Sequence, residues 1–285
     1  MIESPLEPLP TGTLPDSRLL PGLRAVIFDI YGTLFVSGSG DIGVDAAGNR
    51  AGAMSAALES GGLRLTDAAA EVPALFTDAI RRAQALRRAQ GVQFPEVEIR
   101  HVWAEFLRTL LDRELAAGAM PDADGVERIC VEYECLVNPV WPMPGLAECL
   151  SRMHDSHLLM GIVSNAQFFT PPLFEAFLGR GVEGLGFEPF CTLYSYKLLE
   201  AKPSTRLFEL LVAGLREHGF APEQALYIGN DMRNDIAPAR EMGLKTCLFA
   251  GDARSLRMRA GDPLVEGVTP DRVMTDLAQL REITG

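Results

Sequence analysis

Polar residues that together could hydrolyse a small anionic molecule follow the apolar runs of this sequence. They are Asp29 after the run that starts at Arg24, Ser164 and Asn165 after Leu158–Val163, and Asp231 and Asp235 after Ala225–Ile228. Lys202, before Pro203, comes at the end of the longer segment after Phe190. An aspartate can act as a nucleophile that forms a covalent intermediate. Hydroxyl and amide donors stabilise charge that grows in a transition state, and an ammonium group reduces the repulsion between two anions.

The elements that must position these residues are strands of a parallel sheet. The chain predicts strands at 24–28, 158–163, 190–193, 225–228 and 246–249, with helices at 146–153, 171–178, 205–218 and 235–242 between them. Repeated strand and helix units favour a Rossmann-like, doubly wound α/β core with helices on both faces. Ligands of such sheets bind beyond the carboxyl ends of the strands, so the polar residues are expected at one edge.

The middle of the chain has a different, helical pattern. Apolar residues recur at three and four spacing in 51–58, 75–89, 97–115 and 126–137. We therefore predict an α/β core of residues 24–40 and 138–285 and an all-helical cap of residues 41–137 inserted after the first strand. Residues 1–23 contain five prolines and are predicted to form an extended arm.

Composition narrows the class of protein. The 285 residues include 26 Lys and Arg against 38 Asp and Glu, a formal net charge of −12, which argues against a nucleic-acid binder. The five cysteines form no metal-binding or disulfide pattern, and no apolar run is long enough for a membrane span. From composition we expect a cytoplasmic protein without nucleic-acid or membrane partners, with a homodimer left open.

The order of these motifs resembles the haloacid dehalogenase (HAD) superfamily of hydrolases. The resemblance covers residues 24–36 and 137–250, through the Asp-x-x-Gly-Thr, Ser-Asn and Lys-Pro motifs and an acidic cluster, and it implies a helical cap. It makes Asp29 the nucleophile, and Gly32 and Thr33 the turn that holds a phosphate. It makes Ser164 and Asn165 substrate-binding residues. Lys202 is favoured over Lys197 as the lysine that neutralises the nucleophile.

The resemblance also implies a Mg²⁺ cofactor. Its ligands would be the carboxylates of Asp29 and Asp231 and the main-chain carbonyl of Tyr31, because Mg²⁺ prefers oxygen ligands. Asp235 would then orient Lys202 or a metal-bound water. In an alternative alignment, Asn230 takes the first acidic position, which removes one negative charge from the metal site.

Tyr31 departs from the phosphatase branch of the superfamily, which has a second aspartate at this catalytic position. A phenol, with a pKa of about 10, is a poor general base near neutral pH. Tyr31 therefore resembles the 2-haloacid dehalogenase branch, in which the halide leaves without a proton. The acidic pair instead favours a Mg²⁺-dependent phosphatase of small phosphate esters, with a general acid from elsewhere, such as Asp41.

On balance the sequence favours the phosphatase over the dehalogenase. A third reading is a catalytically quiet protein that binds a small anion or a partner. Turnover separates this reading from the two enzymes, since replacement of Asp29 would then change nothing.

Overall fold

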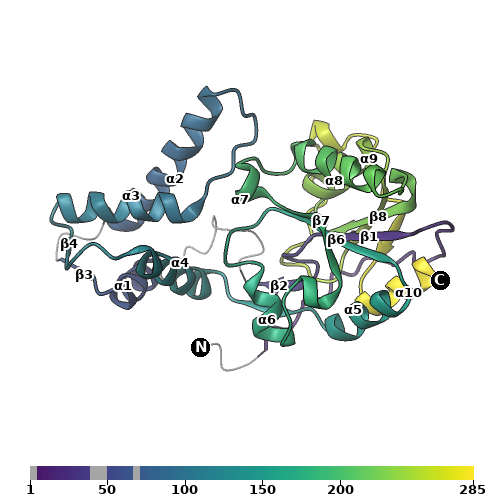
Figure 1. The fold of residues 1–285 in the computed structure, drawn as a ribbon, viewed down its shortest axis with the longest axis horizontal. Coiled ribbons are helices and arrows are strands. Elements are labelled where there is room, and N and C mark those ends of the chain that lie inside the picture. The colour runs from purple at the N-terminus through teal and green to yellow at the C-terminus, as the bar shows by residue number, and fades with distance from the viewer. Residues whose placement is uncertain (1–4, 39–49, 67–70) are drawn as a thin grey trace.

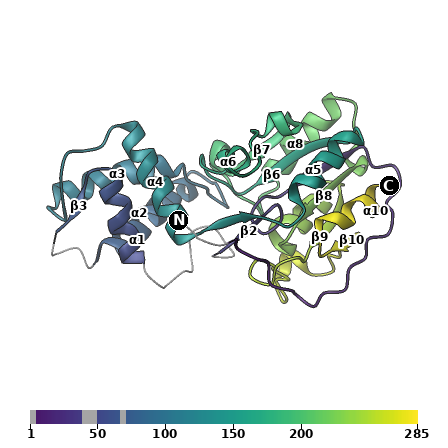
Figure 2. The same cartoon turned by 90° about the horizontal axis from the view of Figure 1, so that it is seen from below.

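The molecule consists of an α/β body and a smaller helical lobe. A computed structural model describes residues 5–38, 50–66 and 71–285. Figures 1 and 2 show helices α1 to α4 gathered in the lobe beside the sheet, and the C-terminus on the body. The predicted boundary between residues 40 and 41 lies outside the described residues.

The body is built on a six-stranded sheet in which every pair of neighbours is parallel, in the order β10-β9-β8-β1-β6-β7. The strands are β1 (Ala25–Phe28), β6 (Leu159–Ser164), β7 (Phe187–Tyr194), β8 (Ala225–Gly229), β9 (Lys245–Phe249) and β10 (Arg272–Met274). Because β1 lies between β6 and β8, the residues that follow these three strands meet at one edge. The predicted fold class is confirmed.

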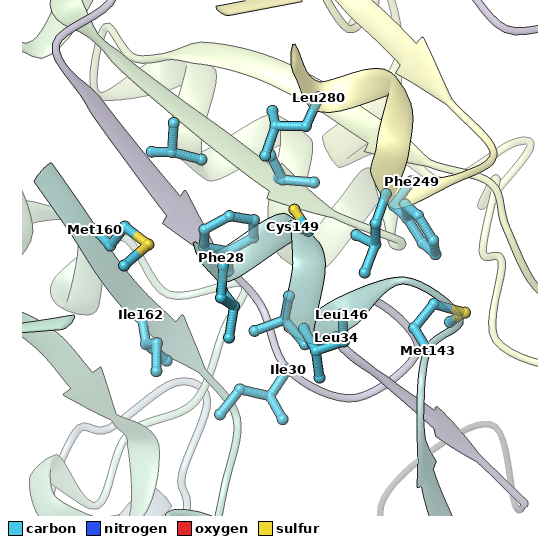
Figure 3. Close-up of a cluster of buried hydrophobic side chains, with 14 of the residues drawn as sticks. Phe28, Ile30, Leu34, Met143, Leu146, Cys149, Met160, Ile162, Phe249 and Leu280 are labelled. Atoms are coloured by element: carbon cyan, nitrogen blue, oxygen red, sulfur yellow. The ribbon is translucent and has the colours of Figure 1, made fainter. Parts of the chain in front are cut away.

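Strand β1 is buried on both faces, and its side chains alternate between two clusters. Val26 and Phe28 join one cluster, and Ala25 and Ile27 join the other. Figure 3 shows the first cluster, with Phe28 close to residues of α5 and α10. The helices of the body are α5 (Leu146–Asp155), α6 (Pro172–Leu178), α7 (Ser195–Leu198), α8 (Arg206–Glu217), α9 (Ala237–Glu241) and α10 (Leu280–Thr284). Helices α5, α6 and α10 cover one face of the sheet, and α8 and α9 cover the other.

The helical lobe has its own core. Its helices are α1 (Arg50–Ser60), α2 (Val72–Ala89), α3 (Ile99–Asp112) and α4 (Ala123–Val137). Phe76, Trp103 and Phe106 pack against one another, with ring centroids 4.3 to 5.7 Å apart. The lobe also contains a two-stranded ribbon of β3 (Arg64–Leu65) and β4 (Ala116–Ala117). The prediction of an all-helical insertion did not include this ribbon.

Within the described residues, the lobe contacts the body at two places. The antiparallel strands β2 (Phe35–Ser37) and β5 (Val140–Pro142) form the first, at the two ends of the insertion. The second is the segment before α3, where the Ala201 N–H donates to the Phe94 carbonyl at 2.8 Å. The side chain of Gln167 bonds the backbone of Val97 and Ile99 nearby. The lobe is therefore tied to the body beside Lys202.

The proline-rich arm lies along the body. Asp16 pairs with Val273 of the edge strand β10, and the Leu9 N–H donates to Asp252. Proline removes backbone donors, which suits a segment that follows a surface and pairs with the edge strand at a single residue, Asp16.

Some elements differ from the sequence-based expectation. The strand predicted at 190–193 extends over Phe187–Tyr194, and the helix predicted at 235–242 begins with a π-helical turn, Met232–Ile236, before α9. The Asp231 side chain accepts from the N–H groups of Arg233 and Asn234 and so starts this turn earlier. Among the described residues, we find no helix with the length and apolarity that crossing a membrane requires.

Candidate active site

A small cavity of about 60 Å³ lies beyond the carboxyl ends of β1, β6 and β8. Asp29 directly follows β1, and Asn230 and Asp231 directly follow β8. The cavity is lined by Asp29, Tyr31, Asn165, Lys202, Asn230, Asp231, Asn234, Asp235, Ser255 and Arg257. Seven of the predicted site residues therefore line one cavity, namely Asp29, Tyr31, Asn165, Lys202, Asn230, Asp231 and Asp235. The cavity suits a small polar ligand.

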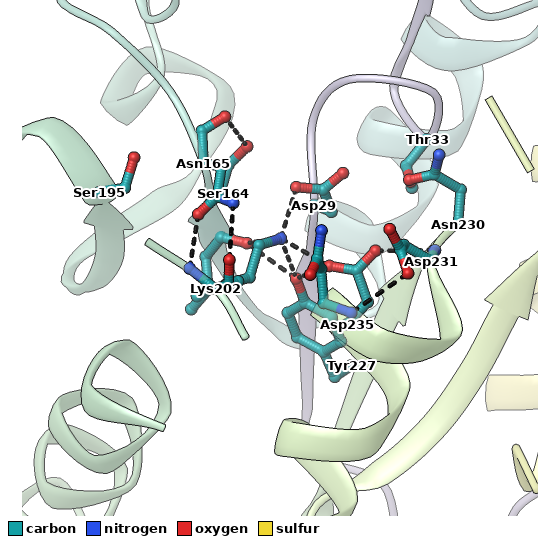
Figure 4. Close-up of polar contacts among 12 residues, drawn as sticks. Asp29, Thr33, Ser164, Asn165, Ser195, Lys202, Tyr227, Asn230, Asp231 and Asp235 are labelled. Carbon is teal, nitrogen blue, oxygen red and sulfur yellow. Dashed lines mark hydrogen bonds and ion pairs between the residues drawn. The ribbon is translucent and has the colours of Figure 1, made fainter. Parts of the chain in front are cut away.

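Lys202 lies at the centre of the polar contacts (Figure 4). Its ammonium nitrogen is 2.8 Å from Asp29 Oδ1 and 2.5 Å from Asp235 Oδ1. Its side chain is 3% exposed, so this lysine is removed from water and held between two carboxylates. Lys197, the competing candidate, instead lies over the ring of Tyr194. Lys202 is thus the lysine that contacts the predicted nucleophile.

Charge and burial act against each other at this lysine. Burial alone would lower the pKa of Lys202, but the charges of Asp235 and Asp29 outweigh it and raise the pKa above its ordinary value. The ammonium group therefore remains protonated at neutral pH. Burial raises the pKa of Asp235, against the opposing effect of Lys202. Asp235 fits there because Gly229 has no side chain. A Cβ at that position would lie 2.4 Å from the Asp235 carboxyl carbon, which is too close.

Tyr227 of β8 completes the Lys202 network and was missed by sequence reasoning, which treated it as an apolar strand residue. Its hydroxyl accepts from Lys202 Nζ at 2.9 Å and lies 2.8 Å from the Val163 carbonyl oxygen and 3.0 Å from Asp235 Oδ1. A buried tyrosine hydroxyl usually has a polar partner, and this tendency is the one signal the sequence offers. Tyr227 is therefore a positioning residue for the lysine.

Tyr227→Phe is expected to lower the free energy of unfolding by about 1 to 3 kcal/mol, because charged groups lose a hydrogen-bond partner. Turnover is expected to fall as well, since Lys202 becomes less fixed. Chemical denaturation of parent and variant measures the first effect, and steady-state kinetics measures the second.

Tyr194→Phe is the matched control. The Tyr194 hydroxyl is buried and has no hydrogen-bond partner in the described part of the chain. Its removal is expected to leave stability unchanged or raised. Equal losses in the two variants would show that the Tyr227 contacts contribute nothing.

Tyr31 lines the cavity, but its hydroxyl is engaged elsewhere. It lies 2.9 Å from the Thr170 hydroxyl and is buried. Burial, followed by the nearby charge of Glu134, raises the pKa of Tyr31. The phenol therefore does not exchange protons readily at neutral pH. Asp41, the predicted substitute acid, lies outside the described residues.

The turn after β1 brings Gly32 and Thr33 against Asn230. Gly32 has a φ of 76°, and a Cβ there would lie 2.5 Å from the Asn230 amide nitrogen and from Ser255 Cβ. Only glycine fits this turn without displacement. The Thr33 hydroxyl lies 3.5 Å from Asn230 Oδ1, a long contact. Neither Gly32 nor Thr33 lines the cavity.

Ser164 and Asn165 lie at the predicted strand end but contact the protein itself. The Ser164 hydroxyl donates to the Asn165 carbonyl at 3.3 Å. The Asn165 side chain accepts from the Lys202 N–H at 2.8 Å and donates to the Lys202 carbonyl at 3.2 Å. Asn165 therefore fixes the backbone of Lys202, and substrate binding by either residue remains a prediction.

The residues predicted to hold Mg²⁺ do not fit the ion in the arrangement described. Asp231 accepts a forked contact from Arg259, with Nη2 at 2.6 Å from Oδ2, and its Oδ1 also accepts the N–H groups of Arg233 and Asn234. Asp29 Oδ1 is bonded to Lys202. In the described ranges, no three His, Cys, Asp or Glu side chains are arranged to hold a metal ion. Arg259 was also missed, because it lies in a segment without a helix or strand pattern.

Comparison with known proteins gives a family match and a set of structural relatives. The family model of haloacid dehalogenase-like hydrolases matches residues 23–243. The 2-haloacid dehalogenase from Pseudomonas syringae pv. Tomato DC3000 is 19% identical, with a TM-score of 0.55 over 91% of this chain and 97% of its own.

Two further structures have lower scores. A predicted phosphoglycolate phosphatase from Haemophilus somnus 129PT is 18% identical, with a TM-score of 0.48 over 92% of this chain and 97% of its own. The HAD-hydrolase YfnB from Bacillus subtilis, bound to magnesium, is 18% identical, with a TM-score of 0.47 over 90% of this chain and 96% of its own. These identities show the fold alone. A search of curated proteins found no match.

Proposed function

Because the chain belongs to the haloacid dehalogenase-like hydrolases, we propose that it is a 2-haloacid dehalogenase, with Asp29 as the nucleophile and no metal cofactor. The observation that carries this choice is the hydrogen bond between the Tyr31 and Thr170 hydroxyl groups. It leaves the position two residues after Asp29 without a usable acid. The leaving group must then depart as an anion, which a halide does.

The other carboxyl groups of the cavity are already paired. Asp235 is bonded to Lys202 and Asp231 to Arg259. Neither is placed as a free acid for a departing alkoxide. The sequence alone favours a phosphatase, and these contacts support the dehalogenase instead.

The reaction proceeds in two steps at Asp29. One carboxylate oxygen attacks the carbon that bears the halogen, so that a C–O bond forms and the halide leaves with the electrons of the C–halogen bond. Water then adds to the carboxyl carbon of Asp29, and the bond from that carbon to the ester oxygen breaks. One proton of the water goes to the released hydroxy acid and the other to solvent.

Lys202 assists both steps. Its ammonium group lowers the repulsion between the Asp29 carboxylate and an anionic substrate. The contact at Oδ1, 2.8 Å long, leaves Oδ2 as the attacking atom. Oδ1 then becomes the carbonyl oxygen of the ester, and Lys202 stabilises its negative charge when water adds.

A Mg²⁺-dependent phosphatase is the second candidate. One observation favours it, since Asp29 and Asp231 line the same cavity. It requires that the ion displace Arg259 from Asp231 and that an acid come from another part of the molecule.

The experiment that tests the proposal measures chloride release from 2-chloropropionate in the presence of EDTA. We expect steady release by the parent protein. The same preparation is tested with p-nitrophenyl phosphate and Mg²⁺, for which we expect no release. Magnesium-dependent phosphate release without chloride release would replace the proposal with the phosphatase, and inactivity on both substrates would favour the quiet binder.

A further inference from the structure

Arg259 and two backbone N–H groups together satisfy the whole Asp231 carboxylate. Arg259 Nε lies 3.2 and 3.1 Å from the two Asp231 oxygens, and Nη2 lies 2.6 Å from Oδ2. The Arg233 and Asn234 N–H groups donate to Oδ1 at 2.9 and 3.2 Å. A carboxylate offers about four lone-pair sites, and these five contacts use them.

The backbone holds Arg259 at this place. The Met232 N–H donates to the Arg257 carbonyl and the Arg257 N–H to the Asn230 carbonyl, both at 2.9 Å. This bridge joins the segment after β9 to the turn after β8, two residues before Arg259. Arg259 itself has a φ of 53°, which is uncommon for a residue with a side chain. Such a conformation persists where the surrounding contacts determine it.

The surroundings favour a fixed guanidinium over an exchangeable metal ion. The Asp231 side chain is 9% exposed and that of Arg259 is 30% exposed, so the pair is largely screened from water. A guanidinium group matches a carboxylate in a forked geometry and is more weakly hydrated than an ammonium group. A divalent ion at Asp231 would have to break these hydrogen bonds and approach a positive charge in a poorly solvated place.

We propose that Arg259 is a resident cation that takes the place of a divalent metal at Asp231 and keeps the site free of one. Asp29 is then neutralised by Lys202 and Asp231 by Arg259. This inference rests on the metal-independent function proposed above and deepens it. It also gives the carboxylate of Asp231 a role in a protein that uses no metal, because the ion pair joins the segment after β9 to the active site.

The test is a titration with Mn²⁺, which takes the oxygen ligands of Mg²⁺ and whose free form is counted by electron paramagnetic resonance. Three proteins are compared, namely the parent, Arg259→Met and the double variant Arg259→Met with Asp231→Asn. We expect no saturable site in the parent at about millimolar Mn²⁺, and affinity raised about tenfold or more in Arg259→Met. The double variant is expected to return to the behaviour of the parent.

Arg233→Met is the matched control. Arg233 lies in the turn that follows Asp231, and its side chain pairs with Asp262. This substitution leaves the contact between Arg259 and Asp231 in place, so we expect no gain in Mn²⁺ affinity.

Two outcomes would overturn the inference. One is a saturable Mn²⁺ site in the parent that Asp231→Asn removes, a result that needs no arginine variant to fold. The other is the absence of a site in both the parent and a folded Arg259→Met. Because metal binding is measured without turnover, failure of the chloride assay is distinguished from failure of this inference.

Discussion

Lys202→Met is expected to abolish hydrolysis and to lower the free energy of unfolding by about 3 to 5 kcal/mol. The Asp29 and Asp235 side chains are 8% and 2% exposed, and both depend on this one ammonium group. Its removal leaves two neighbouring carboxylates in a poorly solvated place without a counter-charge. Chemical denaturation and the chloride assay measure the two effects.

Lys197→Met is the matched control for this prediction. Lys197 is exposed, and its ammonium group lies 5.4 Å from the Tyr194 ring centroid. We expect activity close to that of the parent and a change in stability below about 1 kcal/mol.

Addition of Asp235→Asn to Lys202→Met separates folding from chemistry. It removes one unpaired carboxylate, so stability is expected to recover in part while activity stays lost. This double variant keeps the prediction testable if Lys202→Met alone does not fold. Wild-type activity in a folded Lys202→Met protein would exclude the role given to this lysine.

Asp29→Asn is expected to reduce turnover by about a thousandfold or more, because an amide oxygen is a much weaker nucleophile than a carboxylate. Its Oδ1 still accepts a hydrogen bond from Lys202, so the fold is expected to persist. The chloride assay measures the loss, and thermal unfolding followed by circular dichroism checks the fold.

Asp16→Asn provides the comparison for Asp29→Asn, since Asp16 lies on the arm and pairs with Arg18 away from the cavity. Its turnover is expected to equal that of the parent. Unchanged turnover in Asp29→Asn would support the quiet binder and would remove the basis of the proposed mechanism.

Much of the site follows from the periodicity of the sequence. The strand that ends before Asp29 and the strand that ends before Asn230 are continuous apolar runs, and parallel strands must present their carboxyl ends at one edge. This rule places Asp29 and Asp231 together before any coordinates are known. Lys202 lies beyond α7, and it is identified through the Lys-Pro motif that the family resemblance implies. The helical insertion follows in the same way from its three and four spacing.

The contacts of Tyr227 and Arg259 could not be predicted in this way. Tyr227 lies in a run that reads as a buried strand, and its partners Lys202 and Val163 are 25 and 64 residues away along the chain. Arg259 reaches Asp231 through a left-handed backbone conformation that sequence rules assign to glycine. Both contacts arise from the tertiary arrangement, and Arg259 changes the interpretation of the acidic pair.

The measurement that tests the central claim most directly is a single turnover in water enriched in heavy oxygen. Excess protein is mixed with 2-chloropropionate, and the digested protein and the hydroxy acid are both analysed by mass spectrometry. An ester at Asp29 that water opens at the carboxyl carbon places the heavy oxygen in the peptide containing Asp29, and none in the product of the first turnover. Heavy oxygen in the product and none in the peptide would mean that water attacks the substrate directly, and Asp29 would not be the nucleophile.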